Sequence, residues 1–166
     1  LLPMHGGLLG PGAFAAGALA AHLVARRAGV SSLRLADAAA PAFAVALILV
    51  RIGCYMYGCD YGTRLGSSAP KWLIAMGTFP RFSDPRDSGL IIGSPAFLDQ
   101  MSHSASGLTL DATSALPVHP TQLYECALGL VLLAMTAVMF ARAARRDELP
   151  RPGDVFAPAA LTYGAG

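Results

Sequence analysis

Charged side chains are scarce in this sequence: Asp, Glu, Lys and Arg make up 13% of its 166 residues, whereas 54% are hydrophobic. The mean hydropathy of +0.52 is too high for an ordinary soluble domain of this size. The twelve Lys and Arg residues are scattered and the net charge is only +2, so the chain lacks the basic stripe that follows a nucleic-acid backbone. Composition therefore predicts a membrane protein and argues against nucleic acid as a partner.

Cysteines and familiar enzyme motifs are scarce as well. Three cysteines are too few for a disulfide scaffold, although Cys54 and Cys59 would be able to pair in an oxidising compartment. The sequence contains no phosphate-binding glycine loop, no dinucleotide fingerprint, no G-x-S-x-G elbow and no H-E-x-x-H metal motif. The enzyme classes that depend on those motifs lose support, and we expect no cofactor.

Three apolar segments approach or exceed the ~20 residues needed to cross a membrane. They run from Gly6 to Ala25, from Ala36 to Tyr57 and from Gln122 to Ala141. A fourth apolar segment begins near Asp154 and is cut off at the last residue of the sequence. We therefore expect an all-helical, multi-pass membrane protein with three to four spans, forming one membrane-embedded domain over residues 1–166.

Arginines predict the orientation of these spans, because cytoplasmic loops collect Lys and Arg. They follow the first and third apolar segments, at Arg26, Arg27 and Arg34 and at Arg142, Arg145, Arg146 and Arg151. The opposite ends of the spans then share an outer face with the polar loop over residues 62–118. This loop includes β-like runs at Trp72–Ile74 and Leu90–Ile92, and we expect it to form a small irregular subdomain outside the membrane.

Arg51 lies inside the second apolar segment, where an ionisable residue is costly and is therefore a functional candidate. Its guanidinium remains charged and offers a planar fork of donors that binds phosphate through two hydrogen bonds. Gly53 and Gly58 predict a broken helix end, so we expect the span to unwind near Arg51. The alternative is a structural arginine whose side chain extends to the membrane surface.

His5 precedes Gly6 and Gly7 at the expected outer end of a helix. Backbone N–H groups there favour anions, and the absence of side chains on the glycines lets a lipid headgroup come close. A neutral imidazole is suited to accept a thiol proton near neutral pH, which makes His5 a candidate general base. The alternative is a polar residue at the membrane interface.

The segment from His119 to Glu125 has the features of a helix start. A proline follows the histidine, Gln122 and Glu125 lie three residues apart on one face, and Tyr124 is placed at interface depth. Glu125 would pair with Arg51 and hold it in place. The alternative is a helix cap with an aromatic anchor.

Cys54 and Cys59 are separated by four residues, and with His119 nearby they resemble part of a metal site. The spacing is loose and a fourth ligand is not obvious, so we expect no metal there. Packed thiols or a disulfide on the outer face are the preferred interpretations. A membrane thiol oxidoreductase is a further alternative, but it lacks the C-x-x-C spacing of redox proteins.

Three motifs follow one another along the chain. They are His5-Gly6-Gly7-Leu8, the segment RIGCYMYGCDYG from Arg51 to Gly62, and the segment HPTQLYE from His119 to Glu125. In this order and spacing they resemble the prolipoprotein diacylglyceryl transferase family over nearly the whole chain. Tyr163-Gly164 is similar to the start of the family's final conserved helix.

This resemblance implies a multi-pass enzyme of the bacterial inner membrane, with its active site toward the periplasm. It implies transfer of a diacylglyceryl group from phosphatidylglycerol to the lipobox cysteine of a prolipoprotein. The products would be a thioether and glycerol phosphate. The expected partners are therefore phosphatidylglycerol, prolipoprotein signal peptides and membrane lipids.

The residue chemistry fits that reaction, because the substrate thiol must lose a proton and the phosphate leaving group needs its charge compensated. The resemblance implies catalytic roles for His5, Arg51 and Glu125. The residues expected to bind substrate or lipid are Gly6, Gly7, Arg51, Cys54, Gly58, His119, Gln122 and Tyr124.

The chain departs from the family's pattern in two ways. The best-known arginine motif begins with glycine and carries asparagine and glutamate, where this chain has Val50, Cys54 and Cys59, so it resembles a cysteine-bearing branch. The family also has an earlier span with a functional tyrosine, and an arginine after the tyrosine-glycine segment. This sequence contains neither of them. We therefore expect a chain that is incomplete at both ends and inactive by itself. The alternative function is an inactive membrane relative that binds phospholipid or lipoprotein precursors.

Overall fold

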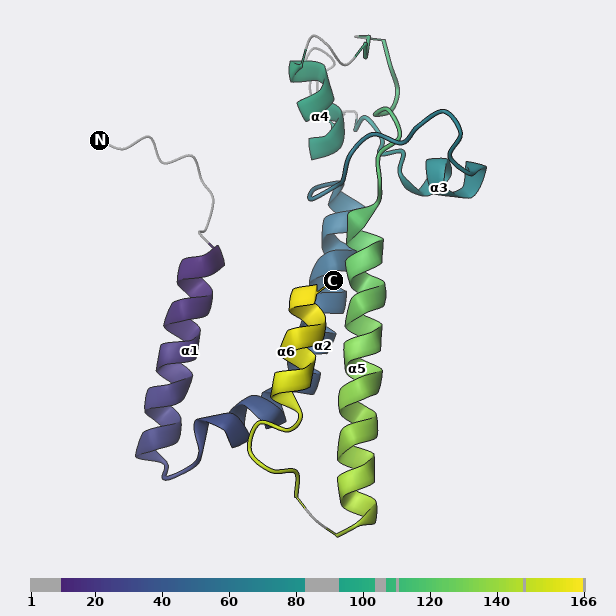
Figure 1. Ribbon diagram of the computed structural model, residues 1–166. Coiled ribbons are helices and arrows are strands. Elements are labelled where there is room, and N and C mark those ends of the chain that lie inside the picture. The colour runs from purple at the N-terminus through teal and green to yellow at the C-terminus, as the bar shows by residue number, and fades with distance from the viewer. Residues whose placement is uncertain (1–9, 83–92, 104–106, 110, 148, 166) are drawn as a thin grey trace, which may run out of the picture. The chain divides into compact units, whose positions relative to one another are not determined.

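A computed structural model describes residues 10–82, 93–103, 107–109, 111–147 and 149–165. Within those ranges the chain forms six helices and two isolated β-bridges, with no β-strand. The helices are α1 (Gly10–Arg27), α2 (Ser32–Tyr57), α3 (Lys71–Met76), α4 (Pro95–Ser102), α5 (Thr121–Arg145) and α6 (Phe156–Ala165) (Figure 1). The described residues fall into two compact units, one within 1–43 and 132–166 and the other within 44–131.

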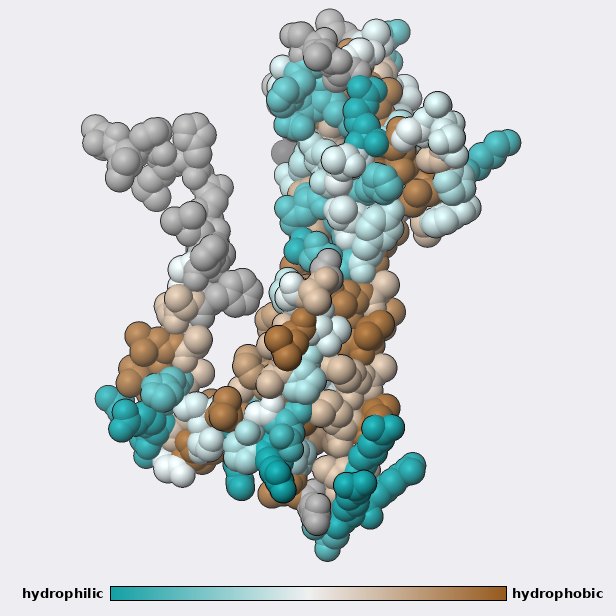
Figure 2. Space-filling model, in the orientation of Figure 1, coloured by the Kyte–Doolittle hydropathy of each residue, from teal (hydrophilic) through white to brown (hydrophobic). Residues whose placement is uncertain are grey.

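Two of the described helices, α2 and α5, are long and apolar enough to cross a membrane, with 26 and 25 residues. Figure 2 shows hydrophobic residues along much of α5. The prediction of an all-helical protein is confirmed for the described residues. The predicted three to four spans are supported for α2 and α5 alone, since the other helices in these ranges fall below the length or hydropathy of a span.

α2 begins at Ser32, before the expected start at Ala36, and continues without a break to Tyr57. It passes through Arg51 as a regular helix, so the predicted unwinding near this arginine is wrong. A continuous helix satisfies its own backbone N–H and C=O groups, whereas an unwound segment in apolar surroundings would leave them without partners.

Gly58 ends α2. Its φ of 80° lies in the left-handed region, and the N–H of Cys59 donates to the carbonyl oxygen of Cys54 at 3.1 Å, which closes the helix end. A Cβ atom added to Gly58 would lie 2.7 Å from Cβ of Ser94, so close packing also requires glycine here. The chain reverses at this point, and the residues after α2 return to its last turn.

The polar segment between α2 and α5 has a small apolar core. Its buried members are Phe79, Ala96, Phe97, Ala115 and Val118. Beside this core, the buried amide of Gln100 donates to the carbonyl oxygen of Leu116 at 3.1 Å and accepts from its N–H at 2.7 Å. A Cβ on Gly77 would collide with the carbonyl oxygen of Val118, so only glycine fits at this position.

Two short helices occur in this segment, where the sequence predicted an irregular loop. The prediction of a β-like run at Trp72–Ile74 is wrong, because these residues lie in α3. The N–H groups of Leu73 and Ile74 donate to the carbonyl oxygen of Pro70 and form the first turn of this helix. α4 begins after Ser94, whose hydroxyl oxygen accepts from the N–H of Phe97 at 3.3 Å. The other predicted run, Leu90–Ile92, lies outside the described residues.

In the unit that contains α6, Asp37 of α2 holds the start of that helix. Its carboxylate accepts hydrogen bonds from the N–H groups of Gly153 at 2.7 Å, Val155 at 3.1 Å and Phe156 at 2.7 Å. The first N–H groups of a helix have no partner within the helix, and negative charge is favourable at that end. This buried acid therefore attaches α6 to α2.

Candidate functional site

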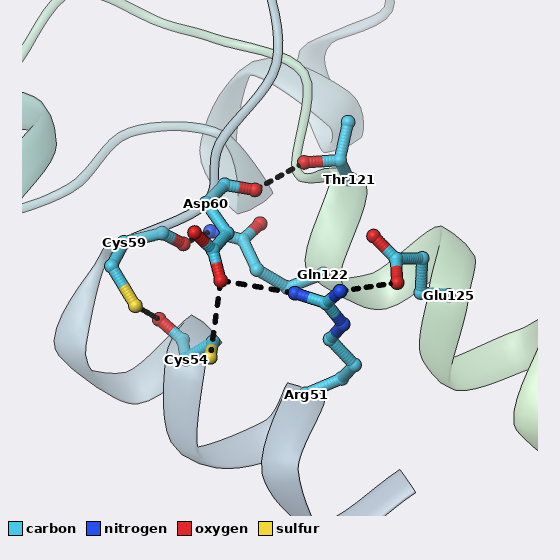
Figure 3. A network of polar contacts seen from close by, with 7 residues as sticks. All are labelled: Arg51, Cys54, Cys59, Asp60, Thr121, Gln122 and Glu125. Atoms are coloured by element: carbon cyan, nitrogen blue, oxygen red, sulfur yellow. Dashed lines mark hydrogen bonds and ion pairs between the residues drawn. The ribbon is translucent and has the colours of Figure 1, made fainter. Parts of the chain in front are cut away.

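A cluster of charged and polar side chains lies where the end of α2 meets the start of α5, within the unit of residues 44–131. Figure 3 shows the guanidinium of Arg51 between two carboxylates. Arg51 comes from α2 and Glu125 from α5, while Asp60 belongs to the turn that follows Gly58. The end of α2, the turn directly after it and the start of α5 therefore supply one charged cluster.

Arg51 makes an ion pair with each carboxylate. Its Nη1 lies 3.0 Å from Oδ2 of Asp60, and its Nη2 lies 2.6 Å from Oε2 of Glu125. The Arg51 side chain is 20% exposed, against 60% for Asp60 and 32% for Glu125. The predicted pairing of Glu125 with Arg51 is thus present. Partly exposed ion pairs contribute at most about 1 kcal/mol to stability, so the main effect of the cluster is to orient the guanidinium.

α2 and α5 approach each other closely just beyond this cluster. A Cβ atom on Gly129 would lie 2.7 Å from Cγ1 of Ile48. One turn earlier in α5, the thiol of Cys126 lies 3.8 Å from the carbonyl oxygen of Ile48. This close contact brings the start of α5 near enough to α2 for Glu125 to reach Arg51.

The turn after α2 is fixed to the start of α5 by two side chains. The hydroxyl of Thr121 donates to the backbone carbonyl oxygen of Asp60 at 2.5 Å. The amide of Gln122, which is fully buried, donates to the backbone carbonyl oxygen of Cys59. Because both bonds hold the backbone of the turn, they position the Asp60 carboxylate against Arg51.

His119 and Tyr124 contact each other at the start of α5. Nδ1 of His119 lies 3.1 Å from the hydroxyl oxygen of Tyr124, and the two rings meet edge to face with centroids 6.2 Å apart. Tyr124 is 46% exposed. The aromatic pair therefore presents a polar edge at the surface.

Cys54 and Cys59 are free thiols that both lie beside Asp60. The thiol of Cys54 donates to Oδ2 of Asp60 at 3.6 Å, and the thiol of Cys59 donates to the carbonyl oxygen of Cys54 at 3.8 Å. Their half-buried positions follow from the reversal of the chain at Gly58. The structure thus brings five predicted residues together at this turn: Arg51, Cys54, Gly58, Gln122 and Glu125.

The predicted base His5 and its neighbours Gly6 and Gly7 lie outside the described residues. Their roles remain predictions. Sequence reasoning missed Asp60 and Thr121. The sequence feature that indicates Asp60 is its position just after Gly58. A turn at a helix-ending glycine returns the chain toward the preceding helical turns, one of which carries Arg51.

Tyr61 extends the network from this turn to α4. Its hydroxyl donates to Oδ2 of Asp99 at 2.6 Å. Burial, together with this hydrogen bond and the charge of Asp99, raises the pKa of Tyr61 to about 12. The phenol therefore remains protonated at physiological pH and keeps α4 attached to the turn.

These observations define a helical protein with two helices of membrane-spanning length and a charged cluster where their ends meet. Over residues 1–166 the chain matches the family model of prolipoprotein diacylglyceryl transferase, and it belongs to this family. The family is one of membrane enzymes that transfer diacylglyceryl groups to lipoproteins. Comparisons with curated proteins and with solved structures gave no match.

Proposed function

We propose that this protein transfers the diacylglyceryl group of phosphatidylglycerol to the lipobox cysteine of prolipoproteins. A carbon–sulfur bond forms on the peptide, the bond between the glycerol carbon and the phosphate oxygen breaks, and glycerol phosphate leaves. The family supports lipoprotein diacylglyceryl transfer in general. The lipid donor, the acceptor thiol and the residue roles are the proposed part.

The observation that carries this proposal is the Arg51 guanidinium held between Asp60 and Glu125. Such a group is charged at every relevant pH, and its planar donors match a phosphate. The Asp60 side chain is the more exposed of the two carboxylates. A lipid phosphate would therefore approach from the Asp60 side and replace that carboxylate on Arg51, while Glu125 keeps the guanidinium oriented.

The chemistry needs one proton acceptor and one compensating cation. The thiol gives its proton to a base, for which we propose His5, and the thiolate sulfur attacks the glycerol carbon. The electron pair of the broken carbon–oxygen bond leaves with the phosphate, whose growing negative charge Arg51 stabilises. The other residues proposed to contact substrate or lipid are Gly6, Gly7, Cys54, Gly58, His119, Gln122 and Tyr124.

We place the protein in the bacterial inner membrane with three to four spans and with the Arg51 cluster on the periplasmic side. The basic residues in the last turns of α1 and α5 support this orientation, because cytoplasmic ends of spans collect arginine. They are Arg26, Arg27, Arg142 and Arg145. Residues 62–118 would then form a subdomain outside the membrane.

One observation favours a second candidate function. Arg51 is already neutralised by two carboxylates, as in an ion pair that only supports the structure. A catalytically inactive relative that binds phospholipid or a lipoprotein precursor would keep this arrangement without turnover.

Transfer of labelled diacylglycerol from phosphatidylglycerol to a lipobox peptide separates the two candidates. The protein is expressed in membranes from its complete gene, as wild type, Arg51→Ala and Arg64→Ala. We expect label on the wild-type peptide thiol, a loss of about 100- to 1,000-fold in Arg51→Ala, and no change in Arg64→Ala, because Arg64 is exposed and lies outside the cluster. Phospholipid binding by the wild type without any transfer would instead establish the inactive relative.

A further inference from the structure

Two thiols and a carboxylate converge at the turn after α2. The side-chain ligand atoms of Cys54, Cys59 and Asp60 all lie within 4.8 Å of one another, and Sγ of Cys54 is 3.6 Å from Oδ2 of Asp60. Figure 3 shows all three side chains around the reversal of the chain. The bond-forming and bond-breaking steps proposed for the transfer reaction use the substrate thiol and not the thiols of Cys54 and Cys59, so their convergence with Asp60 calls for a separate explanation.

We propose that Cys54, Cys59 and Asp60 bind a thiophilic divalent cation, with Zn²⁺ as the best fit. In a tetrahedral zinc site, metal–sulfur bonds of about 2.3 Å and metal–oxygen bonds of about 2.1 Å place neighbouring ligand atoms about 3.6–3.8 Å apart. The distance from Cys54 Sγ to Asp60 Oδ2 already has this value. The ligand atoms of all three residues lie within 4.8 Å of one another, and a rotation of the Cys59 side chain, whose thiol makes only a 3.8 Å contact with a carbonyl oxygen, would close the remaining gap.

The third ligand is Asp60 rather than His119, whose Nδ1 lies beside the hydroxyl of Tyr124. The left-handed backbone of both Gly58 and Asp60 places this carboxylate next to the two thiols. Thiolate ligands select zinc over magnesium or calcium, which prefer oxygen. Three protein ligands leave a fourth position for water or another small ligand, and the exposure of Asp60 provides access to it.

The charge balance of the cluster also favours a divalent cation at this site. Cysteine binds metal as a thiolate, so one dication replaces the protons of Cys54 and Cys59, and two protons are released for each metal bound. The net charge of the group that also contains Arg51 and Glu125 then remains what it was with neutral thiols. Until a lipid phosphate takes its place on Arg51, Asp60 would bind the metal while remaining an acceptor for Arg51, and the metal would thereby fix the position of the guanidinium.

The test uses protein from the complete gene, purified in detergent under reducing conditions, treated with a chelator and titrated with Co²⁺ and then Zn²⁺. We expect one Co²⁺ per chain with sulfur-to-cobalt charge-transfer absorption, which Zn²⁺ abolishes by displacement. Binding of Zn²⁺ to the metal-free protein should release two protons. These readouts do not depend on transfer activity, so their failure is distinct from failure of the proposed reaction.

Single substitutions locate the site. Cys54→Ser and Cys59→Ser should each weaken Zn²⁺ binding by more than the roughly 10- to 100-fold lost with an outer-shell partner. Asp60→Asn should weaken Zn²⁺ binding but retain thiolate–cobalt absorption at saturating Co²⁺. Cys126→Ser is the matched control, because Cys126 lies beside Ile48 in α5 and should bind as wild type. Circular dichroism checks that each variant is folded.

Several results would overturn the proposal. One is the absence of thiolate–cobalt absorption in the reduced wild-type protein, and another is unchanged Zn²⁺ affinity in folded Asp60→Asn. A third is a Cys54–Cys59 disulfide in the isolated protein combined with no metal binding after reduction, which would make the pair a redox element instead.

Discussion

Asp37 of α2, against the start of α6, and Asp60, in the turn after α2, are both acidic residues at helix ends, but their carboxylates have different partners. Asp37 is 5% exposed and accepts three backbone N–H bonds at the start of α6. The side chain of Asp60 is 60% exposed, and a single oxygen accepts from both Arg51 and the thiol of Cys54.

This difference separates a structural charge from an exchangeable one. A carboxylate that is buried and hydrogen-bonded by backbone groups has no room for a competing ligand, and removing it leaves buried donors without partners. A carboxylate that is exposed and shared between side chains can yield its place to a phosphate or bind a cation. Substitution of the buried carboxylate should therefore reduce folding stability. Substitution of the exposed carboxylate should instead change ligand binding or the transfer reaction.

The largest effect on stability should come from Asp37→Ala. Loss of the acceptor for three N–H groups should lower the free energy of unfolding by about 2–4 kcal/mol. Chemical unfolding in detergent micelles, followed by circular dichroism, measures this change. Asp37→Asn is the control, since it keeps one acceptor oxygen and should lose less. Equal stability of Asp37→Ala and wild type would show that the Asp37 carboxylate does not stabilise the fold.

Glu125→Gln should have a smaller effect, and mainly on transfer. The substitution keeps the shape of the side chain but removes the charge that orients Arg51, so we expect kcat to fall about tenfold, which corresponds to 1.4 kcal/mol. The KM for phosphatidylglycerol should not rise, because a negative charge near the phosphate site has been removed. A higher KM with unchanged kcat would show that Glu125 contributes to lipid binding and does not position Arg51. The free energy of unfolding of Glu125→Gln should differ from that of wild type by no more than about 1 kcal/mol.

The smallest effect should come from Tyr61→Phe, which removes the hydrogen bond to Asp99 and should lower the unfolding free energy by about 1 kcal/mol. The raised pKa of Tyr61 gives this contribution a defined pH dependence. It is fully present below the ordinary value of 10.0 and is lost as pH rises through about 12. Wild type and Tyr61→Phe should therefore differ in stability at pH 8 and converge above pH 12. A constant difference across that range would contradict the assignment.

Part of this arrangement could be predicted from the sequence. The apolar runs of α2 and α5 predict long helices because their length and composition suffice by themselves. The pairing of Arg51 with Glu125 could be predicted as well, since a charge within an apolar segment needs a partner. The motifs around those residues also predicted the family, which the match over residues 1–166 confirms.

Other contacts depend on tertiary structure that local patterns do not encode. The position of Asp60 results from left-handed backbone conformations after α2, including its own φ of 55°. The bonds from Asp37 to the start of α6 join residues 116 to 119 positions apart. The pattern at Trp72–Ile74 predicts a β-like run, whereas these residues belong to α3, because three apolar residues carry too little periodicity to separate a helix from a strand.

The most direct test compares Asp37→Asn and Arg51→Lys in the same membranes, measuring the yield of folded protein and the transfer rate per folded molecule. Lysine keeps the charge of Arg51 but lacks the planar fork. We predict that Asp37→Asn lowers the folded yield and leaves the rate per molecule unchanged, while Arg51→Lys keeps the yield and loses most of the rate. A normal rate per molecule in Arg51→Lys would contradict the central claim that the guanidinium held by Asp60 and Glu125 is the phosphate site.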